Sequence, residues 1–341
     1  MLTGRFAPSP SGRMHLGNVF SALLAWLSAR AAGEEFVLRI EDLDPARCRP
    51  EYGELLRDDL RWLGLDWDRE MPMQSTRTQV YAEAFERLRA QGLLYPCFCT
   101  RNELHAASAP HASDGTFVYA GTCRNLSQAQ IAAQTRKPAW RIRVPDEIIS
   151  YIDGVYGEIS QRLSAECGDF ILRRSDGVYA YQLAVVCDDA LGGISQVVRG
   201  RDLLFSTPRQ LWLFEKLGYA APKYFHVPLL VAPDGRRLSK RDKDLDLGQL
   251  RARVTPERLI GTLAFSAGLI ERNEPVSARE LAGEFRWAYP AFGANALRAA
   301  WLEKLAAAGY SLPALVHPRA YVSPTADIRP GAVVLALAAV G

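Results

Sequence analysis

The chain has 341 residues, of which 48% are hydrophobic, so it can bury a full core and we expect more than one compact unit. Its formal net charge of +3 does not by itself indicate a nucleic-acid-binding protein, although basic residues cluster at 136–143, 199–209 and 236–243. No apolar run approaches the roughly 20 residues of a membrane span, and the N-terminus lacks a signal-peptide pattern. We therefore expect a cytoplasmic protein with no membrane partner and no DNA partner.

The first hundred residues predict a strand, a helix and a second strand. A turn rich in Pro, Ser and Gly leads to an apolar helical run at 19–32, and the alternating segment 36–40 ends at Glu41. Such units form parallel sheets with a ligand crevice at the carboxyl ends of the strands. His-Leu-Gly-Asn at 15–18 precedes the helix, so its backbone donors could bind an anion there. Further helices are predicted at 51–63 and 78–91.

The segment 95–124 has few periodic apolar positions and needs something other than a hydrophobic core to hold it. The sequence has six cysteines, and three of them lie in or beside this segment: Cys97, Cys99 and Cys123. In a reducing compartment this distribution favours a metal site plus unpaired thiols over disulfides. Tetrahedral zinc needs a fourth ligand. The chemistry of the residues leaves three candidates: His105, His111 and Tyr119.

After this insertion, apolar segments at 139–144, 168–174 and 179–186 read as strands that resume the sheet. We expect a helix at 203–218 and a last strand at 226–231. We expect the basic loop Arg-Leu-Ser-Lys-Arg, at 237–241, to follow this strand and to lie at the crevice. Its Lys240 offers a mobile ammonium of the kind that a triphosphate needs.

Beyond residue 246 the pattern is helical, starting with Thr255-Pro256-Glu257. The tail differs, because Val322, Ile328, Val334 and Val340 recur every six residues, as in the hexapeptide repeats of left-handed β-helix acyltransferases. Repeats of this kind need several stacked coils, so we expect a loosely ordered tail rather than an acyltransferase domain.

The motifs HLGN and RLSKR resemble the two signature motifs of class I aminoacyl-tRNA synthetases, usually written HIGH and KMSKS. The surrounding motifs are similar to the glutamyl branch of that class, in order from Arg5 to Asp242: GRFAPSPSG, FVLRIEDLD, RWLGLDWD, GDFILRRSDG, YQLAVVCDDALGGISQVVRGRDLL and STPRQ. The resemblance implies an α/β fold with a Rossmann-type parallel sheet, split by a zinc-bearing insertion and followed by a small helical appendage.

The resemblance also implies the domain limits. The two halves of the catalytic domain are expected at 1–94 and 139–246. The zinc-binding part of the insertion is expected at 95–138, and an acceptor-side subdomain is expected to extend to about residue 165. The helical appendage is expected at 247–310 and the tail at 311–341.

The resemblance further implies the site residues. His15 and Lys240 stabilise charge during catalysis, and ATP is bound by His15, Gly17, Asn18, Ser239 and Lys240, with magnesium on its phosphates. The glutamate pocket is lined by Arg5, Phe6, Ala7, Pro8, Ser9, Glu41, Tyr181 and Arg199. In the short members of this branch zinc is held by a Cys-x-Cys and Tyr-x3-Cys pattern. That pattern points to Tyr119 as the fourth ligand beside Cys97, Cys99 and Cys123.

These short relatives are the glutamyl-queuosine tRNA(Asp) synthetases, which transfer glutamate to queuosine in the anticodon of tRNA(Asp). The resemblance implies the same activity here, in a monomer that uses L-glutamate, ATP and tRNA(Asp) carrying queuosine. Val185, where full-length glutamyl enzymes commonly carry Asn, fits the short relatives. The alternatives are a truncated glutamyl-tRNA synthetase that charges the 3′ end of tRNA(Glu), an inactive tRNA- or nucleotide-binding paralogue, and a chain with acyltransferase activity in its tail.

Overall fold

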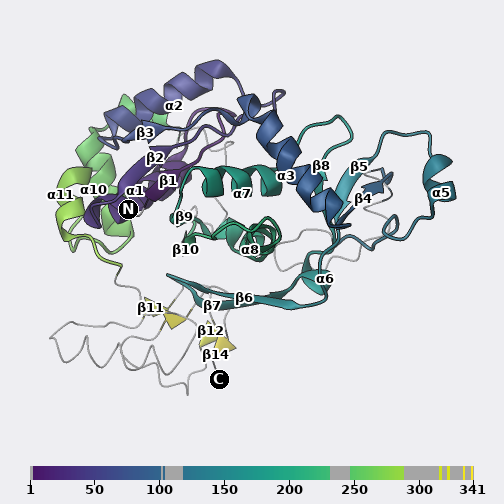
Figure 1. Ribbon diagram of the computed structural model, residues 1–341. Helices are drawn as coiled ribbons and strands as arrows, with labels where there is room; N and C mark the ends of the chain where they lie inside the picture. Colours follow the sequence, from purple (N-terminus) through teal and green to yellow (C-terminus); the bar gives the residue numbers. More distant parts are fainter. Residues whose placement is uncertain are drawn as a thin grey trace.

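The computed structural model describes residues 3–100, 103, 118–230 and 246–287, and four two-residue strands between residues 315 and 340. Its centre is a sheet of five parallel strands in the order β10-β9-β1-β2-β3 (Figure 1). In chain order these strands are β1 Thr3–Phe6, β2 Glu35–Leu38, β3 Arg69–Glu70, β9 Gln196–Gly200 and β10 Lys223–Val227. The strand order runs outward in both directions from β1 and β9. A crevice is therefore expected beyond the carboxyl ends of these two strands.

Helix α1, Leu16–Ala31, is buried along most of its length because its sequence is apolar nearly all round. One side packs on β1, β2 and β9, and the other contacts α11, Ala278–Glu284. Helix α2, Pro50–Trp62, contributes Leu56 and Leu60 to the same core, and α10, Pro256–Ser266, adds Ile260 and Leu263.

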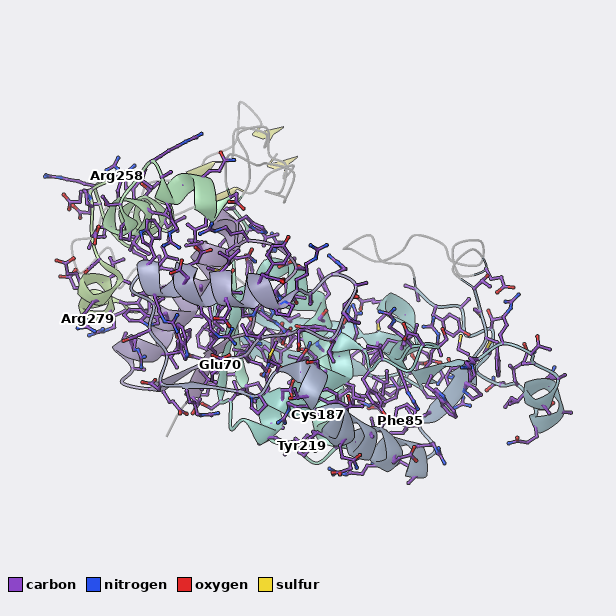
Figure 2. All side chains as sticks on the ribbon, turned by 90° about the horizontal axis from the view of Figure 1, so that it is seen from above. Glu70, Phe85, Cys187, Tyr219, Arg258 and Arg279 are labelled. Carbon is purple, nitrogen blue, oxygen red and sulfur yellow. The ribbon has the colours of Figure 1, made fainter. Side chains whose placement is uncertain are left out.

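A second core lies between three helices: α3 Thr78–Ala90, α7 Tyr181–Leu191 and α8 Thr207–Lys216. Phe85 and Cys187 belong to this core, and Tyr219 packs against it; Figure 2 shows them well away from Arg258 and Arg279 on the helices of the first core. Two 3-10 segments, Gln74–Thr76 and Arg201–Ser206, precede α3 and α8.

The prediction that residues 179–186 form a strand is wrong, because helix α7 begins at Tyr181. This helix is packed by α3 on one side and α8 on another, so its inner turns are apolar without a clear helical period. A short apolar run of this kind does not distinguish a buried strand from a buried helix.

The strands expected at 139–144 and 168–174 exist, as β5 Ala139–Ile142 and β8 Phe170–Arg173. Strand β5 pairs antiparallel with β4, Leu94–Cys97, on one side and with β8 on the other, in a separate sheet of order β4-β5-β8. The expectation that these segments resume the parallel sheet is therefore wrong. That sheet resumes only at β9, since the strands of the insertion pair with one another. Short helices α5, Gln128–Ala132, and α6, Leu163–Glu166, also belong to this part of the chain.

A hairpin of β6, Ile148–Asp153, and β7, Gly157–Arg162, reaches back to the parallel sheet. Its turn lies on the edge strand β10, where Gly154 N donates to Tyr224 O over 2.8 Å. A Cβ atom on Gly154 would lie 2.1 Å from the Phe225 ring, so the contact requires glycine. The hairpin turn thus covers the edge of the sheet close to the ends of β9 and β10.

The helical segment after residue 246 is confirmed within the described residues, as α9 Leu247–Arg251, α10 and α11. Thr255 caps α10 through Arg258 N, with Pro256 in the first turn, as the sequence predicted. None of the helices in the described parts of the chain is both long and apolar enough to cross a membrane.

In the tail, β11 Leu315–Val316 pairs parallel with β13 Val333–Val334, and β12 Tyr321–Val322 pairs parallel with β14 Ala339–Val340. Each pair joins residues 18 positions apart, which is three hexads. This spacing agrees with the hexapeptide pattern of the sequence. The predicted loose order of residues 311–341 stays a prediction, because most of them lie outside the described residues.

Replacing Gly154 by Ala is expected to destabilise the protein by about 1–3 kcal/mol, because the added methyl group overlaps the Phe225 ring. Gly283→Ala is the matched control, since that position in α11 has open space and no left-handed φ. The control should be neutral or slightly stabilising. Urea unfolding of the two variants measures the difference, and equal midpoints would contradict the predicted contact.

Candidate active site

A cavity of about 440 Å³ lies beyond the carboxyl ends of β1 and β9. Its walls include every described residue that the sequence assigned to glutamate or ATP: Arg5, Phe6, Ala7, Pro8, Ser9, His15, Gly17, Asn18, Glu41, Tyr181 and Arg199. Residues from four separate parts of the chain thus meet at one place. Their individual roles stay predictions.

His15 is the N-cap of α1, and its Nδ1 accepts the Gly17 N–H over 3.1 Å. The helix begins three residues earlier than predicted. Asn18 N donates to His15 O over 2.9 Å, and His15 N donates to Asn18 Oδ1 over 3.3 Å. With Gly17 N, three of the backbone donors expected to face an anion are therefore used inside the cap. Because Nδ1 accepts, the proton of the neutral imidazole is assigned to Nε2. The ring and the positive end of the helix dipole then remain the features that favour a phosphate.

A buried charge network lies beneath the cavity. Arg39, fully buried, donates from Nη1 to Asp189 over 2.5 Å and from Nη2 to Glu41 over 3.0 Å. Arg5 Nε also faces Asp189, at 3.4 Å. Burial would raise the pKa of Asp189, but Arg39 and Arg5 outweigh it and lower this pKa. Burial raises the pKa of Glu41, and it outweighs the same two arginines, which lower this pKa.

Asp188, next to Asp189 on α7, extends the network away from the cavity. Its carboxylate accepts from Arg77 Nε at 2.7 Å, Gln74 Nε2 at 2.8 Å and the Tyr81 hydroxyl at 2.9 Å. These donors come from α3 and the segment before it, so the two adjacent acids attach α7 to different parts of the molecule. Burial, followed by the nearby Asp188 charge, raises the pKa of Tyr81, which keeps its hydroxyl a donor.

Arg199 is held by uncharged partners. Its Nε donates to His226 Nε2 over 3.0 Å, and its Nη2 donates to Thr207 Oγ1 over 2.7 Å. The side chain is 5% exposed, and within the described chain its Nη1 has no hydrogen-bond partner. A salt bridge from Arg199 to Asp188 or Asp202, the structural alternative to ligand binding, is not among its hydrogen bonds with described residues.

The side chains predicted to bind glutamate bring two guanidinium groups and one carboxylate to the cavity wall, which also includes Asp202 and Arg13, the latter paired with Asp59. Arg5 uses Nε for Asp189 and makes no hydrogen bond from its terminal nitrogens to the described residues, whereas Arg199 keeps Nη1. Two of the three guanidinium nitrogens of Arg199 are already engaged, so this arginine offers one nitrogen to a carboxylate. With Glu41 opposite, the cavity matches a small molecule that carries two carboxylates and one ammonium.

Ser239 and Lys240 lie outside the described residues. The flanks of their segment are described, and both lie at the cavity. Pro228, Leu229 and Leu230 line it on one side. On the other side the backbone of Asp246 forms an antiparallel β-bridge with that of His15, and Leu247 N donates to Met14 O over 3.0 Å.

A second cavity of about 350 Å³ adjoins the first. The two share wall residues: Ser9, Ser11, Glu41 and Tyr181. Its remaining lining combines the charged residues Asp44, Arg47 and Arg174 with apolar ones such as Leu43 and Val178. Val185 lies one turn beyond Tyr181 on α7, buried in the second core.

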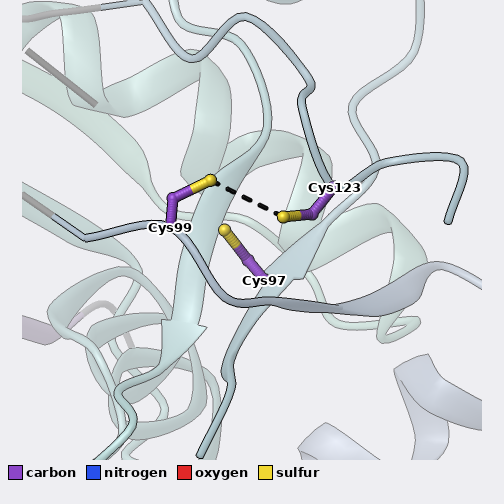
Figure 3. Close-up of side chains that lie close together, drawn as sticks. All are labelled: Cys97, Cys99 and Cys123. Carbon is purple, nitrogen blue, oxygen red and sulfur yellow. Dashed lines mark hydrogen bonds between the residues drawn. The ribbon is translucent and has the colours of Figure 1, made fainter. Parts of the chain in front are cut away.

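Three cysteine sulfurs converge at the start of the insertion, as Figure 3 shows. The ligand atoms of Cys97, Cys99 and Cys123 all lie within 4.8 Å of one another, with Cys99 Sγ 3.5 Å from Cys123 Sγ. The Tyr119 hydroxyl lies 3.5 Å from Cys97 Sγ and 3.8 Å from Cys99 Sγ. A tetrahedral ion bound to sulfur at about 2.3 Å separates its ligand atoms by roughly 3.5–3.8 Å. The four side chains fit a metal ion, while His105 and His111 lie outside the described residues.

Arg141 adjoins this cluster. Its Nε donates to Cys97 Sγ over 3.3 Å, and its guanidinium carbon lies 3.8 Å from the centre of the Tyr119 ring. Burial would raise the pKa of Cys97, but hydrogen bonds from Tyr119 and Arg141 lower it. Burial and the neighbouring thiols raise the pKa of Cys99 to about 12. A buried cation beside several thiols offsets part of the negative charge that metal-bound thiolates bring.

Sequence reasoning missed Arg39, His226 and Asp153. Arg39 could have been found, because it lies two residues before Glu41 in the extended segment that follows β2, where residues two apart point to the same face. His226 was predicted only to begin a strand. Asp153 lies at the end of β6, 73 residues away from His226 in sequence, and no local pattern indicates that they meet.

His226 should make stability depend on pH. Burial lowers its pKa to about 4, against an ordinary value of 6.5, although the hydrogen bond that His226 donates to Asp153 acts in the opposite direction. The unfolded chain therefore binds a proton that the folded protein excludes, so stability is full above about pH 6.5 and falls toward pH 4. We expect a loss of about 2 kcal/mol between pH 7 and pH 5. Urea unfolding should show this slope in the wild type and a flatter one in His226→Gln; parallel curves would contradict it.

Comparison with known proteins agrees with this geometry. Residues 1–268 match the model of the catalytic domain of class I tRNA synthetases of the E and Q type. The "Glutamyl-Q tRNA(Asp) synthetase" of Symbiobacterium thermophilum is 50% identical over 297 residues, covering 82% of this chain and 91% of that protein. Its namesake in Nitratidesulfovibrio vulgaris is 49% identical over 298 residues, covering 83% and 91%.

Among solved structures, a glutamate tRNA ligase from Elizabethkingia meningosepticum, in complex with its amino acid, superposes with a TM-score of 0.71 at 28% identity. The match covers 84% of this chain and spans 65% of the length of that ligase. Methionyl-tRNA synthetase of Mycobacterium tuberculosis, with a TM-score of 0.52 at 12% identity over 77% of this chain and 64% of that one, shares the fold alone. The chain belongs to the class I tRNA synthetases of the glutamyl and glutaminyl type and, within them, to the glutamyl-Q tRNA(Asp) synthetases.

Proposed function

We propose that this protein activates L-glutamate with ATP and transfers the glutamyl group to queuosine in the anticodon of tRNA(Asp). The observation that carries the proposal is the convergence of Arg5, Arg199 and Glu41 in one cavity beside the His15 cap of α1. Two cations and one anion complement the two carboxylates and the ammonium of glutamate. The glutamyl-Q tRNA(Asp) synthetases that are about 50% identical over most of the chain support the acceptor.

In the first step a glutamate α-carboxylate oxygen attacks the α-phosphorus of ATP, and pyrophosphate leaves as its bond to that phosphorus breaks. Arg5 and Arg199 hold the carboxylates, and Glu41 holds the ammonium. The His15 ring and the start of α1 stabilise negative charge that develops on the phosphate, and Lys240 is assigned the same task. Magnesium accompanies the triphosphate as part of the substrate. No protein nucleophile is needed.

In the second step a hydroxyl of the queuosine cyclopentenediol attacks the acyl carbon of glutamyl-adenylate. The bond from that carbon to the phosphate oxygen breaks, AMP leaves, and the hydroxyl proton is released. The acceptor must approach the acyl group from outside the glutamate pocket. The second cavity, which shares Glu41 and Tyr181 with the first, offers the space for that approach.

We also propose that the cluster at the insertion binds zinc, with Cys97, Cys99, Cys123 and Tyr119 as ligands. Three soft thiolates select zinc over magnesium or calcium, and the oxygen of Tyr119 completes four positions. The ion would hold together a segment that contributes only a small apolar cluster. Its role is structural, since none of its ligands lines either described cavity. A monomeric state and a cytoplasmic location stay predictions.

Replacing Cys99 by Ala removes one of the three thiolates and should lower the zinc content of the purified protein well below one ion per chain. Elemental analysis measures the content, and limited proteolysis should show earlier cleavage in the insertion. Cys48→Ala is the matched control, because that thiol lies outside the cluster and should leave the zinc content unchanged. Unchanged zinc in Cys99→Ala would contradict the assignment.

The acceptor can be tested with ATP, labelled glutamate and two tRNAs, one tRNA(Asp) with queuosine and one unmodified tRNA(Glu). A parallel sample of tRNA(Glu) has its 3′ end oxidised with periodate. Periodate would also cleave the queuosine diol, so the 3′ end of tRNA(Asp) is blocked instead by removal of the terminal adenosine, and glutamylation of queuosine is scored on that tRNA. We expect label on this tRNA(Asp) and none on tRNA(Glu).

Label found only on tRNA(Glu), and lost after oxidation of its 3′ end, would identify a glutamyl-tRNA synthetase instead. That outcome overturns the acceptor and leaves the adenylate chemistry intact. An inactive tRNA- or nucleotide-binding paralogue predicts no glutamate-dependent exchange of pyrophosphate into ATP. The exchange assay therefore separates the first step from the choice of acceptor.

A further inference from the structure

The hairpin β6–β7 places an acid beside the strand that carries His226. Asp153, the last residue of β6, is 1% exposed, and its Oδ2 lies 2.6 Å from His226 Nδ1. Its other oxygen, Oδ1, accepts the backbone N–H groups of Val155 at 3.0 Å and Tyr156 at 2.9 Å. Both oxygens are therefore committed, and the carboxylate cannot rotate without losing these bonds.

This arrangement determines which nitrogen of His226 carries the proton. A carboxylate only accepts, so Nδ1 must donate to Asp153, and Nε2 is left as an acceptor. Nε2 then receives the Nε–H of Arg199 at 3.0 Å. The three residues form a chain, Asp153 to His226 to Arg199, that ends at the wall of the first cavity.

The same series of hydrogen bonds orients the Arg199 guanidinium. His226 and Arg199 are register partners on β10 and β9, and Thr207 holds a second nitrogen from α8. With Nε and Nη2 engaged, Nη1 is the only nitrogen of Arg199 without a hydrogen-bond partner among the described residues. Removing the acceptor at His226 would leave the guanidinium held at Nη2 alone, by Thr207 Oγ1 and Leu203 O, and so less firmly oriented.

We propose that Asp153 and His226 are positioning residues, which present Nη1 of Arg199 to a carboxylate of the substrate. The proposal rests on the proposed function only in naming glutamate as that substrate. His226 acts through Arg199, and Asp153 acts through His226. This arrangement requires a neutral His226, because a protonated Nε2 would place its N–H against the Nε–H of Arg199, and neither could accept.

The Asp153→Asn variant tests the hydrogen-bond series Asp153–His226–Arg199 at the end that lies farthest from the cavity. Because two backbone N–H groups require an oxygen at Oδ1, the new amide nitrogen must face His226 Nδ1. His226 then accepts at Nδ1 and carries its proton on Nε2, against the Arg199 donor. We expect the KM for glutamate in ATP–pyrophosphate exchange to rise roughly 10- to 100-fold, as for the loss of one hydrogen bond to a charged group, with the KM for ATP unchanged.

His226 itself offers a conservative rescue. Gln can place its amide oxygen near the Nε2 position, whereas Leu offers no acceptor, so His226→Gln should retain a glutamate KM closer to wild type than His226→Leu. Ser150→Ala is the matched control, because Ser150 is in the same hairpin but bonds only Ser160 across it. The control should keep both KM values. Thermal unfolding and active-site titration establish that each variant is folded.

Three results would overturn the proposal. One is a glutamate KM within twofold of wild type in both Asp153→Asn and His226→Leu. The others are an equal change of the KM values for glutamate and ATP, and a loss of activity that the smaller folded fraction fully explains, because a merely structural role predicts those two.

The proposed function can fail separately, if the wild type gives no glutamate-dependent exchange. Calorimetric titration with glutamate then decides the inference alone. Weaker binding in Asp153→Asn than in Ser150→Ala supports the positioning role, and equal binding rejects it.

Discussion

The structure depends on how charges are buried at the centre of the parallel sheet. Arg39 is fully buried between Asp189 and Glu41, and Arg5 shares Asp189. A buried ion costs several kcal/mol unless it is paired, so none of these side chains is tolerable alone. Together they join β1, β2 and α7, and the carboxylate of Glu41 and the terminal nitrogens of Arg5 are held at the cavity. The same network that stabilises the fold therefore prepares the site.

The two arginines of the site are held by different means. Arg5 is oriented by an ion pair, and Arg199 by a neutral imidazole and a hydroxyl. Because the nearest acid, Asp153, is separated from Arg199 by the neutral imidazole, Arg199 is not directly paired with an acid as Arg5 is, which favours its pairing with an incoming carboxylate. This arrangement needs a histidine that stays neutral, and burial beside Arg199 ensures that it does.

The insertion contributes to the site although its sheet is separate. Its strands β4, β5 and β8 pair only with one another, and its cysteines gather at the distal end. The hairpin β6–β7 returns from this region to the sheet and supplies Asp153. Contacts of this kind explain why the insertion and the catalytic sheet depend on each other: the hairpin covers an edge strand and, through His226, orients a residue of the cavity.

Much of this protein could be predicted from local sequence. The parallel strands around β1, helix α1, the capped helix α10 and the close spacing of three cysteines follow from periodicity, capping residues and spacing. The set of residues in the cavity was implied by the resemblance to the glutamyl synthetases, and it agrees with the rule that strand ends of a parallel sheet meet at one edge. The sequence could not assign residues 179–186, since a helix buried on several sides has no period to read. It also could not show that Nδ1 of His15 is used by its own helix, or that Asp153 meets His226. Those depend on contacts between residues distant in the chain, and only the packed tertiary structure decides them.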